Sequence, residues 1–348
     1  MKSTSLIFMP FSTAYSVVTR ARLAAYQHGL FRITHPGVPV ISVGNITTGG
    51  TGKTPLVEWV CRTIATGDSH ERKKVCVLTR GDGRANPEAQ VVVSSGTEIL
   101  ANERDAGDEP LLLARNLLGV AAVVANRDRL AAAEWAVGSL KTDAFVLDDG
   151  FQHLRIARDL NIVTVDATNP WGGGDTLPYG RLREPIAGLA RADCIVVTRT
   201  DQVEEWQSVK RTIQQIAPDV PVFSSRMVTA GFRGLDGRIV DRGDILSQPL
   251  AAFCGVGNPK SFFSHLEAEG CRLVSRKSFP DHHAYGQSDI DRLVAEAQNS
   301  GASALITTAK DAIKLQLFDL PIPCYVLEVQ IAIDEEHRLV EMIRNVIR

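Results

Sequence analysis

The chain has 348 residues, of which 44% are hydrophobic and 22% are charged, as in a folded globular protein with one large or two ordinary domains. Its formal net charge of −2 argues against broad nucleic-acid binding, because such binding depends on an excess of basic residues that neutralise phosphates. The six cysteines include no Cys-x-x-Cys pair, and four of them sit in apolar runs (Cys76, Cys194, Cys254 and Cys324). We therefore expect buried, reduced thiols in a cytosolic chain.

The N-terminal region predicts an amphipathic helix. The apolar run at 6–9 is too short for a signal-peptide core and is stopped by Pro10. Between 11 and 31, Phe11, Tyr15 and Val18 recur at helical spacing, and arginines such as Arg22 lie nearby. Such a helix either packs on its own domain or lies in a membrane interface. No segment has the roughly 18 to 20 unbroken apolar residues of a membrane span.

From about residue 36, short apolar runs alternate with helical patterns. Continuous apolar runs without alternation are typical of parallel strands that are covered on both faces. The predicted strands are 38–43, 75–78, 91–94, 121–125, 144–147, 162–166 and 194–198. This alternation predicts an α/β fold with a doubly wound, mostly parallel sheet.

The pattern changes near the Pro-Asp-Val-Pro segment at 218–221. Two extended segments follow, at 222–228 and 232–240, with a turn signal at Asp236-Gly237. A second β/α series has predicted strands at 250–255, 304–307 and 323–329. A last helix is predicted at about 334–347, and its pattern is compatible with packing on either domain. We therefore expect an N-terminal helical segment at 1–35, a first α/β domain at 36–220, a β linker at 221–245 and a smaller α/β domain at 246–348.

A glycine-rich segment between the first strand and a helical pattern predicts a phosphate-binding loop (P-loop). Glycines let backbone N–H groups converge on phosphate oxygens at the N-terminus of a helix. Lys53 would neutralise the β- and γ-phosphates of a nucleotide, and the Thr54 hydroxyl would bind Mg²⁺. One position departs from the usual pattern, because Thr47 stands where a glycine is expected. The predicted loop residues are Thr47, Thr48, Gly49, Gly50, Thr51, Gly52, Lys53 and Thr54.

Carboxylates supply the other chemistry that this site needs. The predicted strand 144–147 ends in Asp148-Asp149, at the edge of a parallel sheet where ligands collect. Such an acid near a P-loop lies at the metal site. A kinase also needs a group that orients or deprotonates the attacking hydroxyl. Asp108 is a candidate, and the residues alone do not separate it from Asp105, Asp166 or Asp175.

Two further motifs leave alternatives open. The run Asp281-His282-His283 is compatible with metal ligands, a loop without chemistry or one catalytic histidine. The segment 198–201 follows a predicted strand and faintly echoes a guanine-reading motif, although it lacks the Asn and the Lys. A P-loop GTPase or ATPase switch and a P-loop kinase of a soluble small molecule are therefore both compatible with these motifs.

Taken together and in order, these motifs resemble the tetraacyldisaccharide 4'-kinase family of lipid A biosynthesis. The resemblance covers nearly the whole chain. The segments that carry it are 44–45, 49–55, 107–110, 147–153, 177–178, 182–185, 255–259, 279–283 and 307–312.

The resemblance implies ATP-dependent, Mg²⁺-assisted transfer of a phosphate to the 4'-hydroxyl of tetraacyldisaccharide 1-phosphate. It implies that Asp108 and His282 act as a pair on that hydroxyl. It also places Asp149 and Asp148 at the metal, with Glu109 and Gln152 in support. Arg80, Arg181 and Arg183 become candidates for binding the acceptor.

The lipid acceptor implies a location. A multiply acylated disaccharide does not leave a bilayer easily, so we expect a monomer attached peripherally to the cytoplasmic face of a bacterial inner membrane. The N-terminal helix is the expected contact. No nucleic-acid partner is expected.

Two positions depart from the family pattern. Asp82 stands where an aromatic residue is usual, in the run Arg80-Gly81-Asp82-Gly83, and Ala309 replaces a usual glutamate in 308–311. An aromatic contact to substrate or nucleotide is therefore in question at the first position, and the role of an acid is in question at the second.

Overall fold

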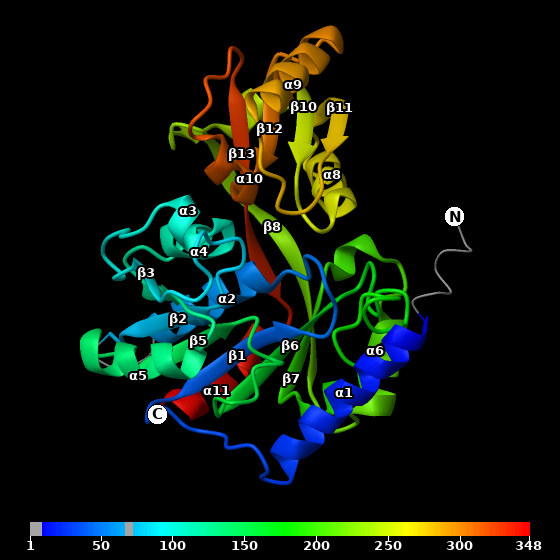
Figure 1. Ribbon diagram of the computed structural model, residues 1–348. Helices are drawn as coiled ribbons and strands as arrows, with labels where there is room; N and C mark the ends of the chain where they lie inside the picture. Colours follow the sequence, from blue (N-terminus) through cyan, green and yellow to red (C-terminus); the bar gives the residue numbers. More distant parts are fainter. Residues whose placement is uncertain (1–8, 67–71) are drawn as a thin grey trace. The chain divides into compact units, whose positions relative to one another are not determined.

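The computed structural model describes residues 9–66 and 72–348, and the chain divides into two compact units (Figure 1). Unit 1 comprises the described residues of Met1–Arg226 together with Ile331–Arg348, and unit 2 comprises Met227–Gln330. Each unit is an α/β layer structure with its own sheet. Residues 1–8, the first part of the expected N-terminal segment, lie outside the described residues.

The sheet of unit 1 is mixed and mostly parallel. Its strands are β1 (Val40–Asn45), β2 (Val75–Thr79), β3 (Val91–Ser94), β4 (Ala121–Ala125), β5 (Ala144–Asp148), β6 (Leu160–Asp166), β7 (Cys194–Thr198) and the first part of β8 (Val222–Gly234). The spatial order is β8-β7-β6-β1-β5-β2-β4-β3, and in it β3 alone runs antiparallel to its neighbour. This confirms the predicted fold class.

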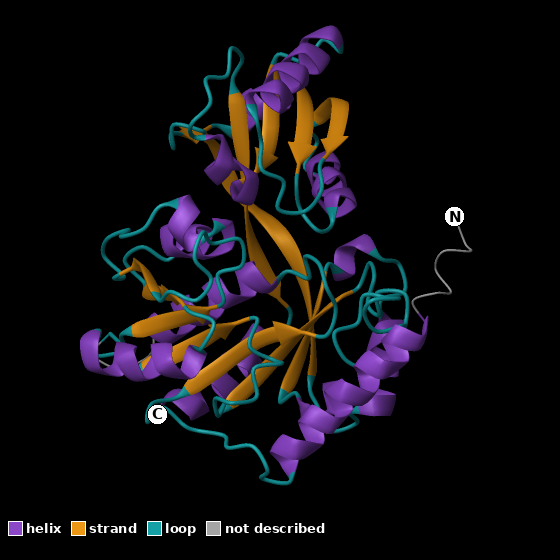
Figure 2. Cartoon of the chain, in the orientation of Figure 1, coloured by secondary structure: helices purple, strands orange, loops and turns teal. Residues whose placement is uncertain are grey.

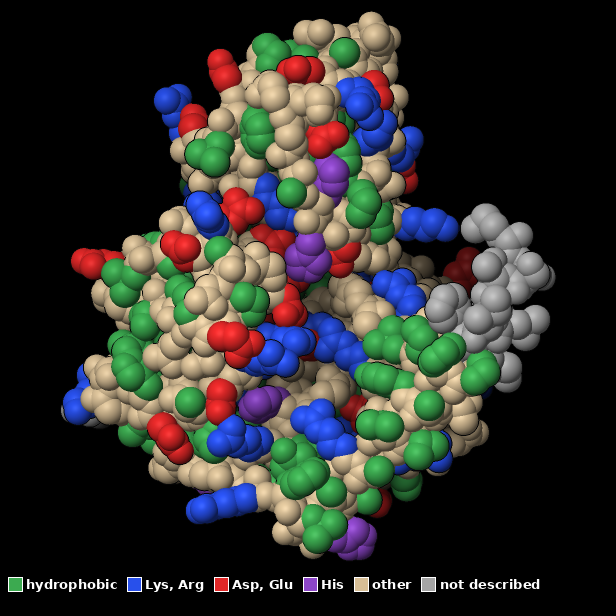
Figure 3. Space-filling view, in the orientation of Figure 1, with side chains coloured by type: hydrophobic (Ala, Val, Ile, Leu, Met, Phe, Trp, Pro, Cys, Tyr) green, Lys and Arg blue, Asp and Glu red, His purple; other side chains and the backbone are tan. Residues whose placement is uncertain are grey.

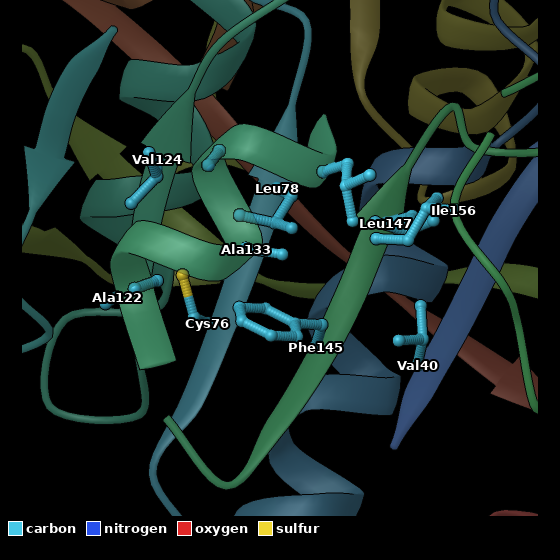
Figure 4. Packing of buried hydrophobic residues seen from close by; sticks show 12 residues of the cluster. Val40, Cys76, Leu78, Ala122, Val124, Ala133, Phe145, Leu147 and Ile156 are labelled. Carbon is cyan, nitrogen blue, oxygen red and sulfur yellow. The ribbon is translucent and has the colours of Figure 1, made fainter. Parts of the chain in front are cut away.

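Helices cover both faces of this sheet (Figure 2). They are α1 (Met9–Gln27), α2 (Lys53–Ala65), α3 (Glu103–Ala106), α4 (Asp108–Asn116), α5 (Arg129–Ser139), α6 (Gln207–Ile216) and α11 (Glu336–Ile347). Figure 4 shows how α5 closes one part of the core, where its Ala133 packs over Leu78, Phe145 and Leu147 of β2 and β5. Burial of such apolar side chains is the main stabilising contribution in a layer of this kind.

Unit 2 contains a second parallel sheet in the order β11-β10-β12-β13. Its elements are the second part of β8, β9 (Ile239–Val240), α7 (Arg242–Leu246), β10 (Pro249–Cys254), α8 (Pro259–Ala268), β11 (Arg272–Ser278), α9 (Gln287–Asn299), β12 (Ala304–Thr308), α10 (Ala309–Leu315) and β13 (Cys324–Ile333) up to Gln330. One apolar cluster includes Phe262 and Leu266 of α8, and another includes Ile290 and Leu293 of α9. This sheet is therefore also covered by helices.

The boundaries of the units differ from the expected domains in two places. The expected linker 221–245 includes β8, a continuous strand that begins in unit 1 and continues into unit 2. The expected second domain ran to residue 348, whereas Ile331–Arg348 cluster with unit 1. The reason is the apolar stripe of α11: Leu339 and Ile343 are buried, and the Trp59 indole of α2 donates to Glu336.

Among the described residues, no helix is both long enough and apolar enough to cross a bilayer. The six cysteines are unpaired and buried, and burial raises the pKa of the Cys76 and Cys194 thiols. These side chains are packing residues of the sheets.

Candidate active site

The predicted P-loop follows β1 and leads into α2. Gly49 and Gly52 adopt positive φ angles of 109° and 81°, a region that side chains with a Cβ rarely enter. Lys53 is the first residue of α2, so the helix N-terminus faces the loop. Thr47, the departure from the glycine pattern, is buried and forms an antiparallel bridge with Leu182. That position needs no positive φ, and a threonine there is accommodated without strain.

Hydrogen bonds behind the loop hold its shape. The Asn45 side chain donates to the Thr51 hydroxyl at 2.9 Å, and that hydroxyl lies 2.9 Å from the hydroxyl of Thr164 on β6. On the other side, the Thr48 N–H donates to the backbone carbonyl of Arg181 at 2.8 Å. The loop is thus tied to both β6 and the segment at 181–183.

Two aspartates at the end of β5 lie beside the P-loop. The Lys53 ammonium is 3.4 Å from Asp149 Oδ1, and Arg183 donates to Asp149 Oδ2. Burial alone would raise the pKa of Asp149, but Lys53 and then Arg183 outweigh it and hold that pKa at about 2. Asp149 is therefore ionised at neutral pH and paired with the lysine of the loop.

The neighbouring Asp148 has the opposite electrostatics. It is buried, and the Thr79 hydroxyl donates to its Oδ2 at 3.0 Å. Burial, then Glu109, then Asp149 raise its pKa to about 6. The structure thus brings Glu109 into the electrostatic surroundings of Asp148 and Asp149, as expected for the acids of one site.

This group of oxygens fits a Mg²⁺ ion. Mg²⁺ prefers oxygen ligands and usually takes one or two carboxylates, with phosphates and water completing its shell. Asp148 and Asp149 are the carboxylates beside the P-loop, Glu109 acts on the pKa of Asp148, and Thr54 lies next to Lys53 at the start of α2. Among residues 9–66 and 72–348, no group of three or more His, Cys, Asp or Glu side chains is arranged to hold a metal ion.

Gln152 lies at the same turn but is already engaged. Its side-chain nitrogen donates to the Asn45 carbonyl at 2.8 Å and to Glu184 at 2.7 Å. Glu184 is buried and also pairs with Arg191. Gln152 therefore links the end of β1 to Glu184, in the segment at 181–185.

Asp108 is the first residue of α4 and is 6% exposed. Its Oδ1 accepts the backbone N–H of Glu109 at 2.9 Å. The preceding Gly107 has φ 86°, and a Cβ there would lie 2.6 Å from the carbonyl oxygen of Asp82. The Gly-Asp-Glu-Pro motif thus requires its glycine for the sharp entry that presents Asp108 and Glu109 at a helix N-terminus.

The other candidate bases have different roles in the structure. Asp105 is exposed, and its carboxylate accepts from the Asn102 side chain within the cap of α3. Asp166 forms a buried ion pair with Arg199. Asp175 is exposed, and its backbone carbonyl accepts the Leu182 N–H. Of the four candidates, Asp108 is the one whose neighbour in sequence, Glu109, acts on the pKa of Asp148 at the end of β5.

The three arginines proposed for the acceptor are not equivalent. Arg183 is committed to Asp149. Arg80 is exposed and lies 3.2 Å from Asp82, the residue at the usual aromatic position. Arg181 is exposed and supports the P-loop through its backbone. In the view of Figure 3, Lys, Arg, Asp and Glu side chains lie close together on the surface of unit 1.

In unit 2, His282 belongs to a loop at 279–286, here called the histidine loop. His282 has a left-handed φ of 60°, and its N–H donates to Asp281 Oδ1. Lys310, at the start of α10, places its ammonium 3.1 Å from Asp281 Oδ1 and 3.2 Å from His282 Nε2. The neighbouring Ala309, where the family has a glutamate, leaves these contacts in place.

The buried carboxylate of Asp311 supports the histidine loop through hydrogen bonds. Asp311 is fully buried and accepts hydrogen bonds from the Tyr285 hydroxyl at 3.0 Å and from the Gly255 N–H at 3.0 Å. The Tyr285 ring in turn packs edge-on against His283 and Phe279. The motifs at 255–259, 279–283 and 307–312 therefore meet in one network within unit 2.

Sequence reasoning overlooked two cations of these networks. Lys310 was noted for its neighbour Ala309 and not for its own contact with His282. Arg199 was compared with a guanine-reading motif, whereas it contacts the P-loop, as described below. For Arg199 the available signal was a charged residue immediately after a predicted strand, which is a common place for site residues in α/β sheets.

A glycine-rich P-loop whose lysine pairs with a strand-end aspartate defines a P-loop nucleotide-binding protein. The comparisons narrow this class. The family model for tetraacyldisaccharide-1-P 4'-kinase matches residues 4–348, and the chain belongs to that family.

Relatives and a solved structure agree. The chain is 41% identical over 308 residues to a tetraacyldisaccharide 4'-kinase of Geobacter metallireducens, covering 87% of this chain and 86% of the relative. It is 37% identical over 320 residues to one of Desulfotalea psychrophila, covering 91% and 89%. A crystal structure of LpxK from Aquifex aeolicus, described as in complex with ATP, matches with a TM-score of 0.78 and 29% identity, covering 99% of this chain and 100% of that one.

Proposed function

We propose that this protein transfers the γ-phosphate of ATP to the 4'-hydroxyl of tetraacyldisaccharide 1-phosphate, in lipid A biosynthesis. The observation that carries the proposal is the P-loop lysine, Lys53, paired with Asp149 beside a second buried aspartate, in a chain that the kinase family model matches over residues 4–348. Phosphoryl transfer depends on such positioned charges.

The nucleotide is held by unit 1. The backbone N–H groups of the P-loop bind the phosphates, and Lys53 follows the charge that develops between the β- and γ-phosphates. Thr54, Asp149 and Asp148 would hold Mg²⁺ with Glu109 in support, and the bound ion would neutralise charge on the phosphates. Gln152 supports this arrangement through its contacts with Asn45 and Glu184.

Asp108 accepts the proton of the acceptor hydroxyl as the oxygen attacks the γ-phosphorus. A new O–P bond forms, the bond to the bridging oxygen of the β-phosphate breaks, and ADP leaves with that electron pair. We also assign His282 to the acceptor hydroxyl, and within unit 2 Lys310 and Asp281 orient its ring. Arg80 and Arg181 are the exposed cations available to anionic groups of the acceptor.

We further propose that the protein works peripherally at the cytoplasmic face of the inner membrane. One side of α1 is tied to unit 1, because the hydroxyls of Ser12 and Ser16 each lie 2.8 Å from the Thr176 hydroxyl. Its other side exposes Phe11 at 61% and Val18 at 66%, and Figure 3 shows hydrophobic side chains over this helix. Exposed apolar groups on a helix favour an interfacial location.

The experiment separates nucleotide binding from transfer. Asp108→Asn should reduce formation of 4'-phosphorylated product by about 100-fold, while the Kd for Mg-ATP changes less than about threefold. Asp105→Asn is the matched control, since it changes a nearby exposed acid, and it should keep near-normal transfer. A loss of ATP affinity in Asp108→Asn equal to its loss of transfer would contradict the assignment. Full activity towards a soluble sugar in the absence of lipid and detergent would contradict the acceptor.

A further inference from the structure

The segment after β7 contacts the P-loop directly. Thr198 is fully buried, and its hydroxyl donates to the backbone carbonyl of Thr51 at 2.9 Å. Arg199 donates through Nη1 to the backbone carbonyl of Gly50 at 2.9 Å. Two successive residues of one strand end thus bind two successive carbonyls of the loop.

Arg199 is itself held in a largely buried ion pair. Its Nη1 also donates to Asp166 Oδ2, at 2.6 Å, and the two side chains are 12% and 7% exposed. Arg199 has a left-handed φ of 57°, and the other Asp166 oxygen accepts from the Thr168 N–H and hydroxyl. A buried ion pair on strained backbone adds little net stability, because desolvation offsets the attraction. The role of the Arg199–Asp166 pair is therefore to position the P-loop backbone that Arg199 contacts.

The two bound carbonyls determine where the loop points its N–H groups. A trans peptide is planar, with its carbonyl and the following N–H directed to opposite sides. A Gly50 carbonyl held by Arg199 turns the Thr51 N–H the other way, and a Thr51 carbonyl held by Thr198 does the same for the Gly52 N–H. Phosphate binding needs a loop whose N–H groups converge on one side. Glycine-rich backbone would otherwise lose much conformational entropy on binding.

We propose that Arg199, with Thr198, is a positioning residue that holds the P-loop in its phosphate-binding conformation before the nucleotide arrives. The inference rests on the proposed nucleotide site and adds to it a residue pair that contacts the backbone of the P-loop. Pre-organisation of this kind raises affinity by removing an ordering cost. Thr198 and Arg199 therefore act on the phosphate end of the nucleotide.

A merely structural role would have different consequences. Loss of a structural ion pair lowers the melting temperature and leaves the nucleotide affinity of the folded protein unchanged. Loss of a positioning residue raises the Kd and KM for ATP and leaves the KM for the acceptor unchanged. The two roles are therefore separable by measurement.

The test is calorimetric titration of the full chain with Mg-ATP and Mg-ADP, together with steady-state kinetics. Arg199→Met should raise the Kd for both nucleotides by at least about tenfold, which is the range expected for a lost charge-assisted hydrogen bond. Arg199→Lys should restore part of that loss. Arg233→Met is the matched control, because Arg233 also bridges a carboxylate and a glycine carbonyl, Glu328 and Gly237, but does so in unit 2. The control should bind ATP as the wild type does.

Thr198→Val keeps the test decisive should Arg199→Met fail to fold. Valine keeps the shape of threonine but lacks the buried hydroxyl, so this variant should raise the Kd for ATP about threefold or more. Unchanged nucleotide affinity in both folded variants overturns the inference, and so does unchanged affinity in Thr198→Val alone when the arginine variant is unfolded. Absence of ATP binding by the wild-type chain would overturn the nucleotide site itself, which is a distinguishable result.

Discussion

The two adjacent aspartates at the end of β5 should respond to neutralisation with opposite signs. Asp148→Asn removes a buried charge that sits among other acids, and the new side-chain oxygen can still accept from Thr79. Asp149→Asn removes the partner of Lys53 and Arg183. The first change should stabilise the folded chain at neutral pH, and the second should destabilise it.

The magnitudes follow from the pKa values. Burial and the neighbouring acids raise the pKa of Asp148 from its usual 3.8 to about 6, which corresponds to about 3 kcal/mol against the ionised folded state. Above pH 3.8 the unfolded chain releases this proton while the folded chain keeps it. Wild-type stability relative to Asp148→Asn therefore falls as pH rises to about 6 and is level above that.

For Asp149 the sign is reversed. Its burial is outweighed by Lys53 and Arg183, so its pKa is held at about 2, below the usual 3.8. The difference corresponds to about 2 kcal/mol of stability, present above pH 3.8 and lost as pH falls towards about 2. Asp149→Asn should therefore be less stable than the wild type at neutral pH.

Urea denaturation from about pH 4 to about pH 8, without Mg²⁺, measures these differences. Both variants should lose kinase activity, and added Mg-ATP should stabilise the wild type more than either of them. A stability gain in Asp148→Asn that is independent of pH would refute the electrostatic reasoning, as would destabilisation of both variants by similar amounts.

Three further changes test other parts of the structure. Gly107→Ala places a Cβ 2.6 Å from a backbone oxygen at a positive φ, so it should cost about 1–3 kcal/mol of stability and reduce transfer, as urea denaturation and kinetics will show. Lys310→Met should lower kcat about tenfold with an unchanged Kd for ATP, because it removes a contact of the histidine loop; an equal rise in that Kd would contradict this. Phe11→Ser with Val18→Ser should weaken sedimentation with anionic lipid vesicles while leaving activity on detergent-dispersed acceptor near normal.

Local signals were sufficient for much of the fold. Buried strands such as Val75–Thr79 and Ala144–Asp148 consist mainly of continuous apolar residues, so the sequence pattern alone predicts them. The predicted turn at Asp236-Gly237 is confirmed by the antiparallel pairing of β8 with β9. By contrast, Arg272–Ser278 was missed as a strand, because most of its side chains are partly exposed and polar residues interrupt its apolar pattern.

The site residues likewise divide into those predictable from a local motif and those that depend on tertiary contacts. Lys53 and Thr54 belong to a contiguous motif, so the sequence alone indicates their chemistry. Arg199 contacts the loop only because β6, β7 and β1 are neighbours in the sheet, and strand order is not readable from the segments themselves. The contact between Lys310 and His282 likewise depends on how separate segments of unit 2 fold together.

The most direct test of the account is to follow the phosphate. Purified protein is incubated with Mg-ATP labelled at the γ-position and tetraacyldisaccharide 1-phosphate in detergent, and the lipid product is analysed by mass spectrometry and phosphorus NMR. The account predicts one labelled phosphate on the 4'-oxygen for each ADP formed. Hydrolysis of ATP without a phosphorylated lipid, or label at another hydroxyl, would contradict it.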